Sequence, residues 1–319
     1  MKKKLFLSIV LLVFSSFASA QCCSAGNPFF YGELSSLSKQ NLQFVAGYKY
    51  GTSSQYYSGS EKIDIDFVNK AYFNYLTLQF IYGLTERITL QADLGYFLNK
   101  TETYLKEGWE TSNGFGMGDA NLTFKYLAYD NFKKRIKIVP AIGVTFPIGV
   151  FDQEVNNVKL PITVQPSSGS FKYQISLFVS KGTNSGKFYF TVFGMYEYAQ
   201  LINSENFYYK YGNQYLFSFL TSYKIGKKLS IALEVRSENR VRALRNDDQV
   251  VESSGFNIVY LVPHLSWAFH NNWYLALNTD IPVYKFYNGI QLSNTYSVSV
   301  RLSYKINFRK TNLKEFDIN

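Results

Sequence analysis

The sequence predicts an all-β protein, a transmembrane outer-membrane β-barrel of about twelve antiparallel strands with short periplasmic turns and longer extracellular loops. Three observations predict this fold. A secretory signal opens the chain, apolar and polar residues then alternate with a period of two over long segments, and the connections between these segments alternate between short and long. Aromatic residues make up 18% of the chain, in agreement with the aromatic girdles of membrane barrels.

Residues 1–20 have the features of a signal peptide. Three lysines precede an apolar run from Leu5 to Phe14, and Ala18-Ser19-Ala20 forms a small-residue cleavage site. Residues 21–39 would then be a periplasmic N-terminal leader. Cys22 and Cys23 lie in this leader, where their role is left open, because adjacent cysteines rarely bridge each other and a lipidated cysteine follows a small residue directly.

Composition excludes several classes of protein. No apolar run after the signal approaches the roughly 18 residues of a membrane-spanning helix, which excludes a helical inner-membrane protein. The net charge is +10, but an exported chain does not meet nucleic acid, so the expected partners are membrane lipid, lipopolysaccharide and small solutes. With two cysteines and two histidines, the sequence predicts no metal site and no cofactor.

The alternation is clearest in the last segment, where Tyr296, Val298 and Val300 face one way and Ser297 and Ser299 the other. Most of the segments are long enough for the 9 to 11 residues that a tilted strand needs to cross a bilayer, about twice the usual length of a soluble strand. Closing such long strands into a barrel removes their exposed edges. In chain order the expected strands are 40–50, 71–84, 88–98, 118–129, 135–147, 170–181, 187–199, 213–225, 229–240, 256–269, 273–284 and 294–308.

The connections fall into two sets. Short turns are expected at 85–87, 130–135, 181–186, 226–228 and 270–272, and longer polar loops at 51–70, 99–117, 148–169, 200–212, 241–255 and 285–293. Short turns belong to the periplasmic side of such barrels, and an even strand count places both termini there. The barrel is therefore expected over residues 40–308, followed by a periplasmic tail, 309–319.

A glycine-rich stretch, GFGMGDANLTFKYLAY, begins at Gly114. A nucleotide-binding fingerprint needs a third glycine at the position of Asp119 and a helix after it, and the sequence has neither. Since the residues after Asp119 alternate as a strand does, we expect Gly114 to Gly118 to end an external loop and Asp119 to begin a strand.

Three stretches resemble a known family of outer-membrane transporters assigned to the meta-pathway of phenol degradation, distant relatives of the fatty-acid and toluene channels. They are GMGDANLTFKYLAY ending at Tyr129, PAIGVTFPIG at 140–149, and Ile281 to Leu292. The resemblance implies a channel for small solutes, with hydrophobic or aromatic compounds as one candidate class. Two departures stand out: Ile148 replaces the expected threonine, and a long N-terminal plug is lacking, which argues against the mechanism of the fatty-acid channels.

The more polar face of the strands is expected to line the lumen. There, charged residues either fill a narrow barrel as a network of opposite charges or line a small pore that selects solutes by size and charge. Glu234, Arg236, Glu238 and Arg240 alternate in sign on one strand face, which favours a network locally. The predicted pore-lining residues are Lys49, Asp93, Lys125, Lys137, Lys172, Glu197, Lys224, Glu234, Arg236, Asp280, Arg301 and Lys305.

Three functions remain open: a channel for passive uptake of small solutes, a structural or surface-interaction barrel without a conducting pore, and an outer-membrane phospholipase. The phospholipase would use His264, Ser266 and Asn278, but the first two fall on the less apolar face, away from lipid. We therefore expect no enzyme. The last strand ends in Phe308 after alternating aromatics, which resembles the strand read by the barrel-assembly machinery.

Overall fold

The computed structural model describes residues 35–65, 67–105, 111–204, 207–246 and 248–308. The predicted signal peptide, Cys22, Cys23 and the tail 309–319 lie outside these ranges. Across the described ranges no helix is long and apolar enough to cross a membrane.

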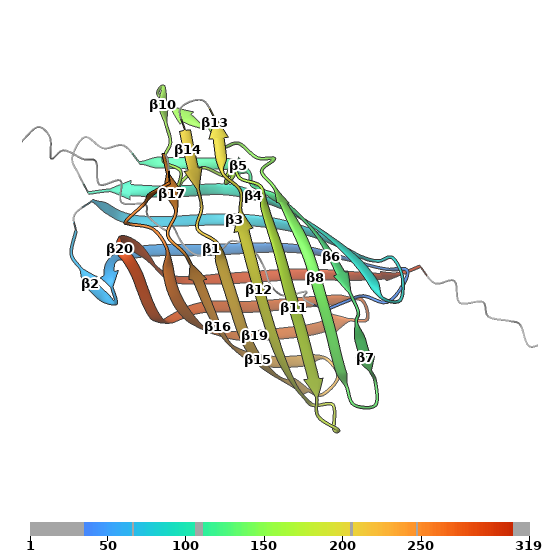
Figure 1. Ribbon diagram of the computed structural model, residues 1–319. Helices are drawn as coiled ribbons and strands as arrows, with labels where there is room; N and C mark the ends of the chain where they lie inside the picture. The colour runs from blue at the N-terminus through green and yellow to red at the C-terminus, as the bar shows by residue number, and fades with distance from the viewer. Residues whose placement is uncertain (1–34, 66, 106–110, 205–206, 247, 309–319) are drawn as a thin grey trace, which may run out of the picture.

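Antiparallel strands close into a single barrel (Figure 1). Of the fourteen strands in the main sheet, eleven form the ring, and the ring closes because β8 pairs with β11 and β20 pairs with β1. The ring strands are β1 (Asn41–Gly59), β3 (Val68–Gly83), β4 (Ile88–Tyr104), β6 (Ala120–Tyr126), β8 (Ile136–Phe146), β11 (Lys172–Gly182), β12 (Phe188–Ala199), β15 (Gln214–Ile225), β16 (Leu229–Arg240), β19 (Phe256–His270) and β20 (Trp273–Asn307). Closure leaves the ring without a free sheet edge.

Strand β20 is 35 residues long, and its two halves pair with different neighbours. Its first half pairs with β19, and its second half pairs with β1, both antiparallel. The halves also contact each other: Lys305 N donates to Asn272 O at 3.0 Å, and Ser297 Oγ donates to Asp280 Oδ2 at 2.6 Å. The chain therefore folds back on itself near Gly289, whose φ of 61° suits a glycine.

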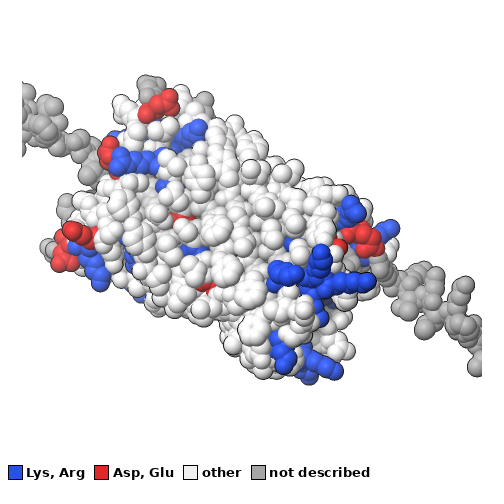
Figure 2. Space-filling view, turned by 60° about the horizontal axis from the view of Figure 1, so that its bottom comes forward, with Lys and Arg blue, Asp and Glu red and all other residues white. Residues whose placement is uncertain are grey.

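Side chains alternate between the inside and the outside of the wall. In β3, Thr77 and Gln79 are buried inside, while Leu76, Leu78 and Phe80 are exposed outside. This pattern places polar residues inside and apolar residues outside, the reverse of a soluble β-protein. Figure 2 shows the consequence, because most of the surface between the two ends carries no charged side chain in that view.

The two ends of the barrel differ in their connections. One end, called here the short-turn end, carries the predicted short turns, with residues 84–87, 132–135, 183–187, 226–228 and 271–272 between strands. It also holds the short strand β7 (Tyr129–Asn131). The opposite, long-loop end holds the remaining short strands: β2 (Glu61–Ile63), β5 (Ser112–Met117), β9 (Glu154–Val155), β10 (Val158–Lys159), β13 (Ile202–Ser204), β14 (Phe207–Lys210), β17 (Leu244–Arg245) and β18 (Gln249–Val250).

The long loops have their own packing. Strands β13, β14, β17 and β18 form a separate sheet from the loops after β12 and β16. Ile202, Tyr209, Ala243 and Val251 are buried together, and Phe151 from the loop after β8 packs against them. Three loops distant in sequence are thus held together by apolar contacts over that end of the barrel (Figure 1).

Several expected loops are wrong in extent. Strand β1 continues to Gly59 and β3 already begins at Val68. Residues 285–293 hold the fold-back near Gly289, but the strand pairing continues through them, so no separate loop remains. The extension of β1, residues 51–59, has a polar and glycine-rich sequence because it projects beyond the apolar band, where nothing requires an apolar outer face. The period-two pattern therefore ends before the strand does.

The glycine-rich stretch also differs from expectation. Gly114 lies in β5, which pairs with β4 from Ser112 to Met117, so this segment is a strand and not the end of a loop. Gly118 and Asp119 interrupt the wall, and β6 begins at Ala120, two residues after the start of the expected strand 118–129 and one after Asp119. A register shift between Phe97 and Lys100 of β4 accompanies this interruption.

Candidate functional site

A network of ion pairs crosses the interior of the barrel around Arg236. The Arg236 guanidinium lies 2.9 Å from Glu238, 2.9 Å from Asp280 and 3.9 Å from Glu234. Asp280 in turn pairs with Lys49 at 2.9 Å and accepts the bond from Ser297 described above. The four strands β1, β16, β19 and β20 are linked by this network, since His264 of β19 contacts Glu234 at 2.9 Å.

Three of the four alternating charges on β16, Glu234, Arg236 and Glu238, therefore form the predicted network, whereas Arg240 is hydrogen-bonded to Gln214. Every charged group in it is almost fully buried, and a buried charge is tolerated when opposite charges and hydrogen bonds surround it. Each of the three carboxylates around Arg236 has at least one cationic partner.

A second polar cluster lies on the neighbouring strands β3, β4 and β6. Gln79 and Gln91 donate to Asp93 at 2.9 and 2.7 Å. On the next strand, Lys125 Nζ donates to the backbone oxygen of Ser35 at 3.4 Å. The segment before β1 therefore contacts the inner face of the wall, and Leu37 N also donates to Thr89 Oγ1 at 2.9 Å.

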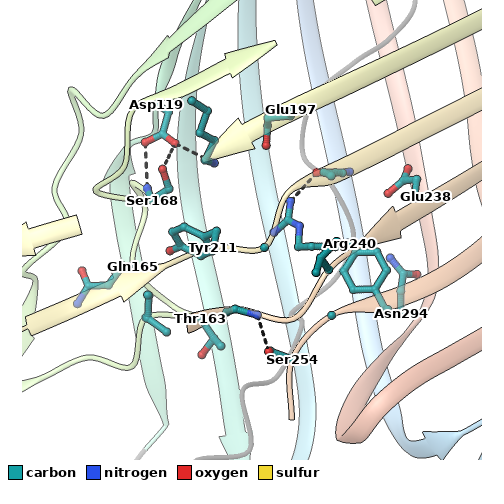
Figure 3. Close-up of a pocket in the computed structure, with 18 of the residues that line it drawn as sticks. Asp119, Thr163, Gln165, Ser168, Glu197, Tyr211, Glu238, Arg240, Ser254 and Asn294 are labelled. Carbon is teal, nitrogen blue, oxygen red and sulfur yellow. Dashed lines mark hydrogen bonds and ion pairs between the residues drawn. The ribbon is translucent and has the colours of Figure 1, made fainter. Parts of the chain in front are cut away.

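Toward the long-loop end, the interior opens into a cavity of about 220 Å³ (Figure 3). Its walls come from β3, β4, β11, β12, β15, β16, β19 and β20, and its cover comes from the loops that contain Thr163, Tyr211 and Ala243. Glu238, a member of the ion-pair network, also lines the cavity, so the network and the cavity adjoin.

Asp119 fixes the covering loop. Its Oδ1 accepts bonds from Ser167 Oγ at 2.6 Å and Ser168 N at 2.9 Å, and its Oδ2 accepts one from Ser168 Oγ at 2.5 Å. Lys172 lies 3.6 Å from the same carboxylate. Figure 3 shows these groups together at one side of the cavity. The wall is interrupted at Asp119, so its carboxylate points inward. There it binds Ser167 and Ser168 of the loop between β8 and β11.

Arg240, Gln214 and Asn294 lie on the side of the cavity away from Asp119. Arg240 donates to Gln214 Oε1 at 2.5 Å, and Asn294 lines the same side of the cavity (Figure 3). Gln214 and Asn294 are only 1% and 2% exposed. Aromatic rings of Phe256, Tyr260 and Tyr287 complete this wall, which therefore combines polar and apolar surface.

The Tyr211 hydroxyl belongs to the covering loops, outside the barrel strands. Burial raises the pKa of Tyr211 well above its usual value, with smaller effects from Tyr209 and Asp119 in the same direction. Its hydroxyl therefore stays neutral and adds a hydrogen-bonding group to the cover of the cavity.

The structure distributes the predicted pore-lining residues over three regions. Lys172 and Glu197 line the cavity. Lys137, Lys224 and Lys305 lie toward the short-turn end: Lys137 is 3.8 Å from Asp130, while the other two sit over Tyr189 and Tyr274. The remaining seven are buried within the barrel: Lys49, Asp93, Lys125, Glu234, Arg236, Asp280 and Arg301.

Sequence reasoning missed most of the cavity. Gln214 and Asn294 lie at the ends of predicted strands, where polar residues are common, and no pattern distinguished them. The inward loop around Ser167 was expected only as an external loop. Neither Gly118-Asp119 nor the serines at 167 and 168 form a motif by themselves. Only the fold brings Asp119 and Ser167 into contact.

The residues considered for a phospholipase lie on β19 and β20. His264 and Asn278 are directly paired across β19 and β20, as their spacing predicted. However, His264 contacts Glu234, and Ser266 is paired with Ala276 in the same ladder. Among the residues that the structure describes, no group of three His, Cys, Asp or Glu side chains could hold a metal ion.

No family model matches the sequence, and no curated protein matches it. Among solved structures, the chain is similar to the COG4313 outer membrane channel from Pseudomonas putida F1, with 15% identity and a TM-score of 0.71 over 87% of this chain and all of that one. The KdgM porin (10% identity, TM-score 0.46, 82% and 98% of the two chains) and the NanC porin (12%, 0.42, 82% and 97%) are less similar. The first likeness shows that this chain has the fold of an outer-membrane β-barrel.

Proposed function

We propose that this protein is an outer-membrane channel for the passive uptake of small solutes. One observation carries the proposal: a closed barrel with an apolar outer face contains a polar, charged interior with a cavity inside it. A barrel of this kind is stable in lipid because its backbone is fully paired, and its interior offers polar solutes a path away from lipid.

The proposed orientation follows from the two ends. The short-turn end faces the periplasm, together with the leader 21–39 and the tail 309–319, and the long-loop end faces outward. If each half of β20 is counted as one crossing, the wall makes twelve crossings. The apolar belt meets membrane lipid, the outer loops meet lipopolysaccharide, and the barrel-assembly machinery reads the last strand together with Phe308, which follows it.

Along the proposed path, a solute enters the cavity from the long-loop end and then passes the network around Arg236. The predicted pore-lining residues of the barrel interior would select solutes there by size and charge. The aromatic cavity walls support hydrophobic or aromatic compounds as a substrate class, in line with the resemblance to transporters of the phenol-degradation pathway. We propose no enzymatic step and no cofactor.

The second candidate is a structural barrel without a conducting pore. The buried network favours it, because Arg236 and its partners occupy the interior. Osmotic swelling of proteoliposomes separates the two: a channel lets small sugars and amino acids enter and the vesicles swell, with rates that fall as solute size rises. Folded protein that gives no swelling with any solute would support the structural barrel.

The same preparation tests the phospholipase. Vesicle lipid should remain intact, and a Ser266→Ala variant should swell like the parent protein. Hydrolysis of phospholipid that is lost in Ser266→Ala would replace the channel proposal with an enzyme.

A further inference from the structure

The turns at the short-turn end carry a group of exposed lysines. They lie on or beside three turns, 132–135, 183–187 and 226–228. In the described ranges none of these lysines lies within 4.0 Å of a carboxylate oxygen, and the carboxylate of Asp130 pairs with Lys137 instead. The group, called here the lysine sector, consists of Lys133, Lys134, Lys181, Lys187, Lys227 and Lys228.

The lysine sector occupies one side of the barrel. Its turns lie at the ends of β8, β11, β12, β15 and β16, which follow one another in the ring. The other two short turns differ, because 84–87 holds one acid and one base, Glu86 and Arg87, and 271–272 holds no charged residue. Figure 2 shows blue side chains gathered at the end where Figure 1 places β7, whereas red and blue are mixed at the opposite end. The surface charge is therefore unevenly distributed, both between the two ends and around the short-turn end.

The lysine sector begins where the apolar outer surface ends. Leu177, Phe190 and Phe219 are exposed on the outer face of its strands. Lys181 lies on the same face of β11 as Leu177, four residues nearer the turn. Because a lysine stem can follow an apolar surface while its ammonium group stays in a polar layer, these side chains can reach the level of the lipid headgroups.

The arrangement fits a layer of many anions better than one bound ion. The ammonium groups are spread over three turns, and Lys181 Nζ donates to Lys134 O at 3.0 Å, which brings two of the turns into contact. Lysine presents a point charge on a flexible stem and has no fixed geometry for a single ligand. Like charges repel one another, and a layer of anionic headgroups beside them relieves this repulsion.

We propose that the lysine sector is a docking surface for the headgroups of anionic phospholipids in the leaflet that surrounds the short-turn end. In the proposed orientation this is the periplasmic leaflet. Lipid is the partner that the position favours, since the sector continues directly from the lipid-facing surface of the same strands. Docking requires a barrel inserted in lipid and does not depend on conduction.

A tryptophan beside the lysine sector can report the local lipid. Trp267 is exposed on the outer face and pairs with Leu229, and Ala268 N donates to Lys228 O at 2.7 Å. A Trp109→Phe background leaves Trp267 and Trp273 as the two tryptophans of the chain. The protein is reconstituted in vesicles of equal parts phosphatidylcholine and phosphatidylglycerol, with one lipid or the other brominated, because bromine quenches tryptophan fluorescence on contact.

Brominated phosphatidylglycerol should quench more strongly than brominated phosphatidylcholine. The preference should shrink at about 1 M salt, where the Debye length falls to about 3 Å. Changing all members of the lysine sector to Gln should remove the preference, and Lys227→Gln with Lys228→Gln should lower it, because these two lie next to Trp267.

Lys62→Gln with Lys70→Gln is the matched control. It removes two exposed lysines at the long-loop end and should keep the quenching ratio of the parent. Heat-modifiable migration on gels confirms that each variant is folded.

Two results would overturn the proposal: equal quenching by the two brominated lipids in the parent, or an unchanged preference when the whole lysine sector is replaced. Equal quenching together with binding of soluble polyglutamate that the replaced sector loses would assign the surface to an acidic protein instead. Swelling of the same vesicles tests the channel separately. Lipid preference without swelling would contradict the proposed function alone, and swelling without lipid preference would contradict this inference alone.

Discussion

At the scale of single residues, Arg236 holds the interior together. Its guanidinium is the shared partner of Glu234, Glu238 and Asp280. The sequence predicted the local charge alternation and placed Asp280 and Lys49 on the lumen side. It did not predict that Asp280 pairs with both Arg236 and Lys49, because these residues lie on separate strands that meet only in the closed barrel.

Replacing Arg236 with Ala tests this role. The three carboxylates would lose a shared cation in a buried site, so the free energy of unfolding should fall by about 3–5 kcal/mol. Denaturant unfolding of the protein in lipid vesicles measures it. Arg242→Ala is the control and should cost less than about 1 kcal/mol, because Arg242 and Glu252 are exposed. Similar effects of both changes would show that the network does not stabilise the barrel.

Gly95 provides a second test at this scale. A Cβ atom at Gly95 would collide with the Tyr75 hydroxyl, since the Tyr75 ring lies over this glycine and packs against Phe97 at a centroid distance of 4.6 Å. Gly95→Ala should therefore push Tyr75 away and destabilise the barrel by about 1–3 kcal/mol, measured by the same unfolding assay.

Gly194→Ala is the matched control for Gly95, because a Cβ atom there meets nothing within 4 Å. It should leave stability almost unchanged. An equal loss of unfolding free energy in both variants would mean that alanine destabilises the strand at either position. The close approach of Tyr75 to Gly95 would then not be the cause.

At the scale of elements, the sequence predicted the existence of most ring strands and of the short turns, because lipid on one side and polar groups on the other impose a strict period of two. It did not predict β5, the interruption at Asp119 or the inward loop around Ser167. The inward loop depends on contacts between Asp119 and serines 48 and 49 residues away, and β5 depends on its pairing with β4, whereas a local period carries no information about which segments meet.

Strand β3 tests the assignment of inside and outside. Leu78 is 51% exposed on the outer face near the middle of β3, where lipid would surround it. Leu78→Arg should destabilise the barrel by about 2–4 kcal/mol, as a charge does at the bilayer midplane. Unfolding in lipid vesicles again measures the change.

Phe132→Arg is the control for Leu78, since Phe132 is 90% exposed in a short turn and should tolerate the charge. If Leu78→Arg were as stable as the parent, the face assignment of β3 would be reversed, and every side chain of that strand would point to the opposite side.

At the scale of the whole molecule, the fold follows from the sequence more fully than the site does. Signal, alternation and connection lengths together specify a closed membrane barrel. The candidate site depends on which inward residues meet across the lumen, and that is set by the register and stagger of the closed sheet. Gln214 and Arg240 are adjacent only because β15 and β16 pair in one register.

The central claim, a barrel that conducts small solutes, is tested most directly by single-channel recording in planar lipid bilayers. The purified, folded protein should produce discrete conductance steps, and these should be absent when the protein is heat-denatured before addition. The steps should be small, because the network around Arg236 narrows the interior. Bilayers that remain silent although heat-modifiable migration confirms folded protein would contradict the account and favour a structural barrel.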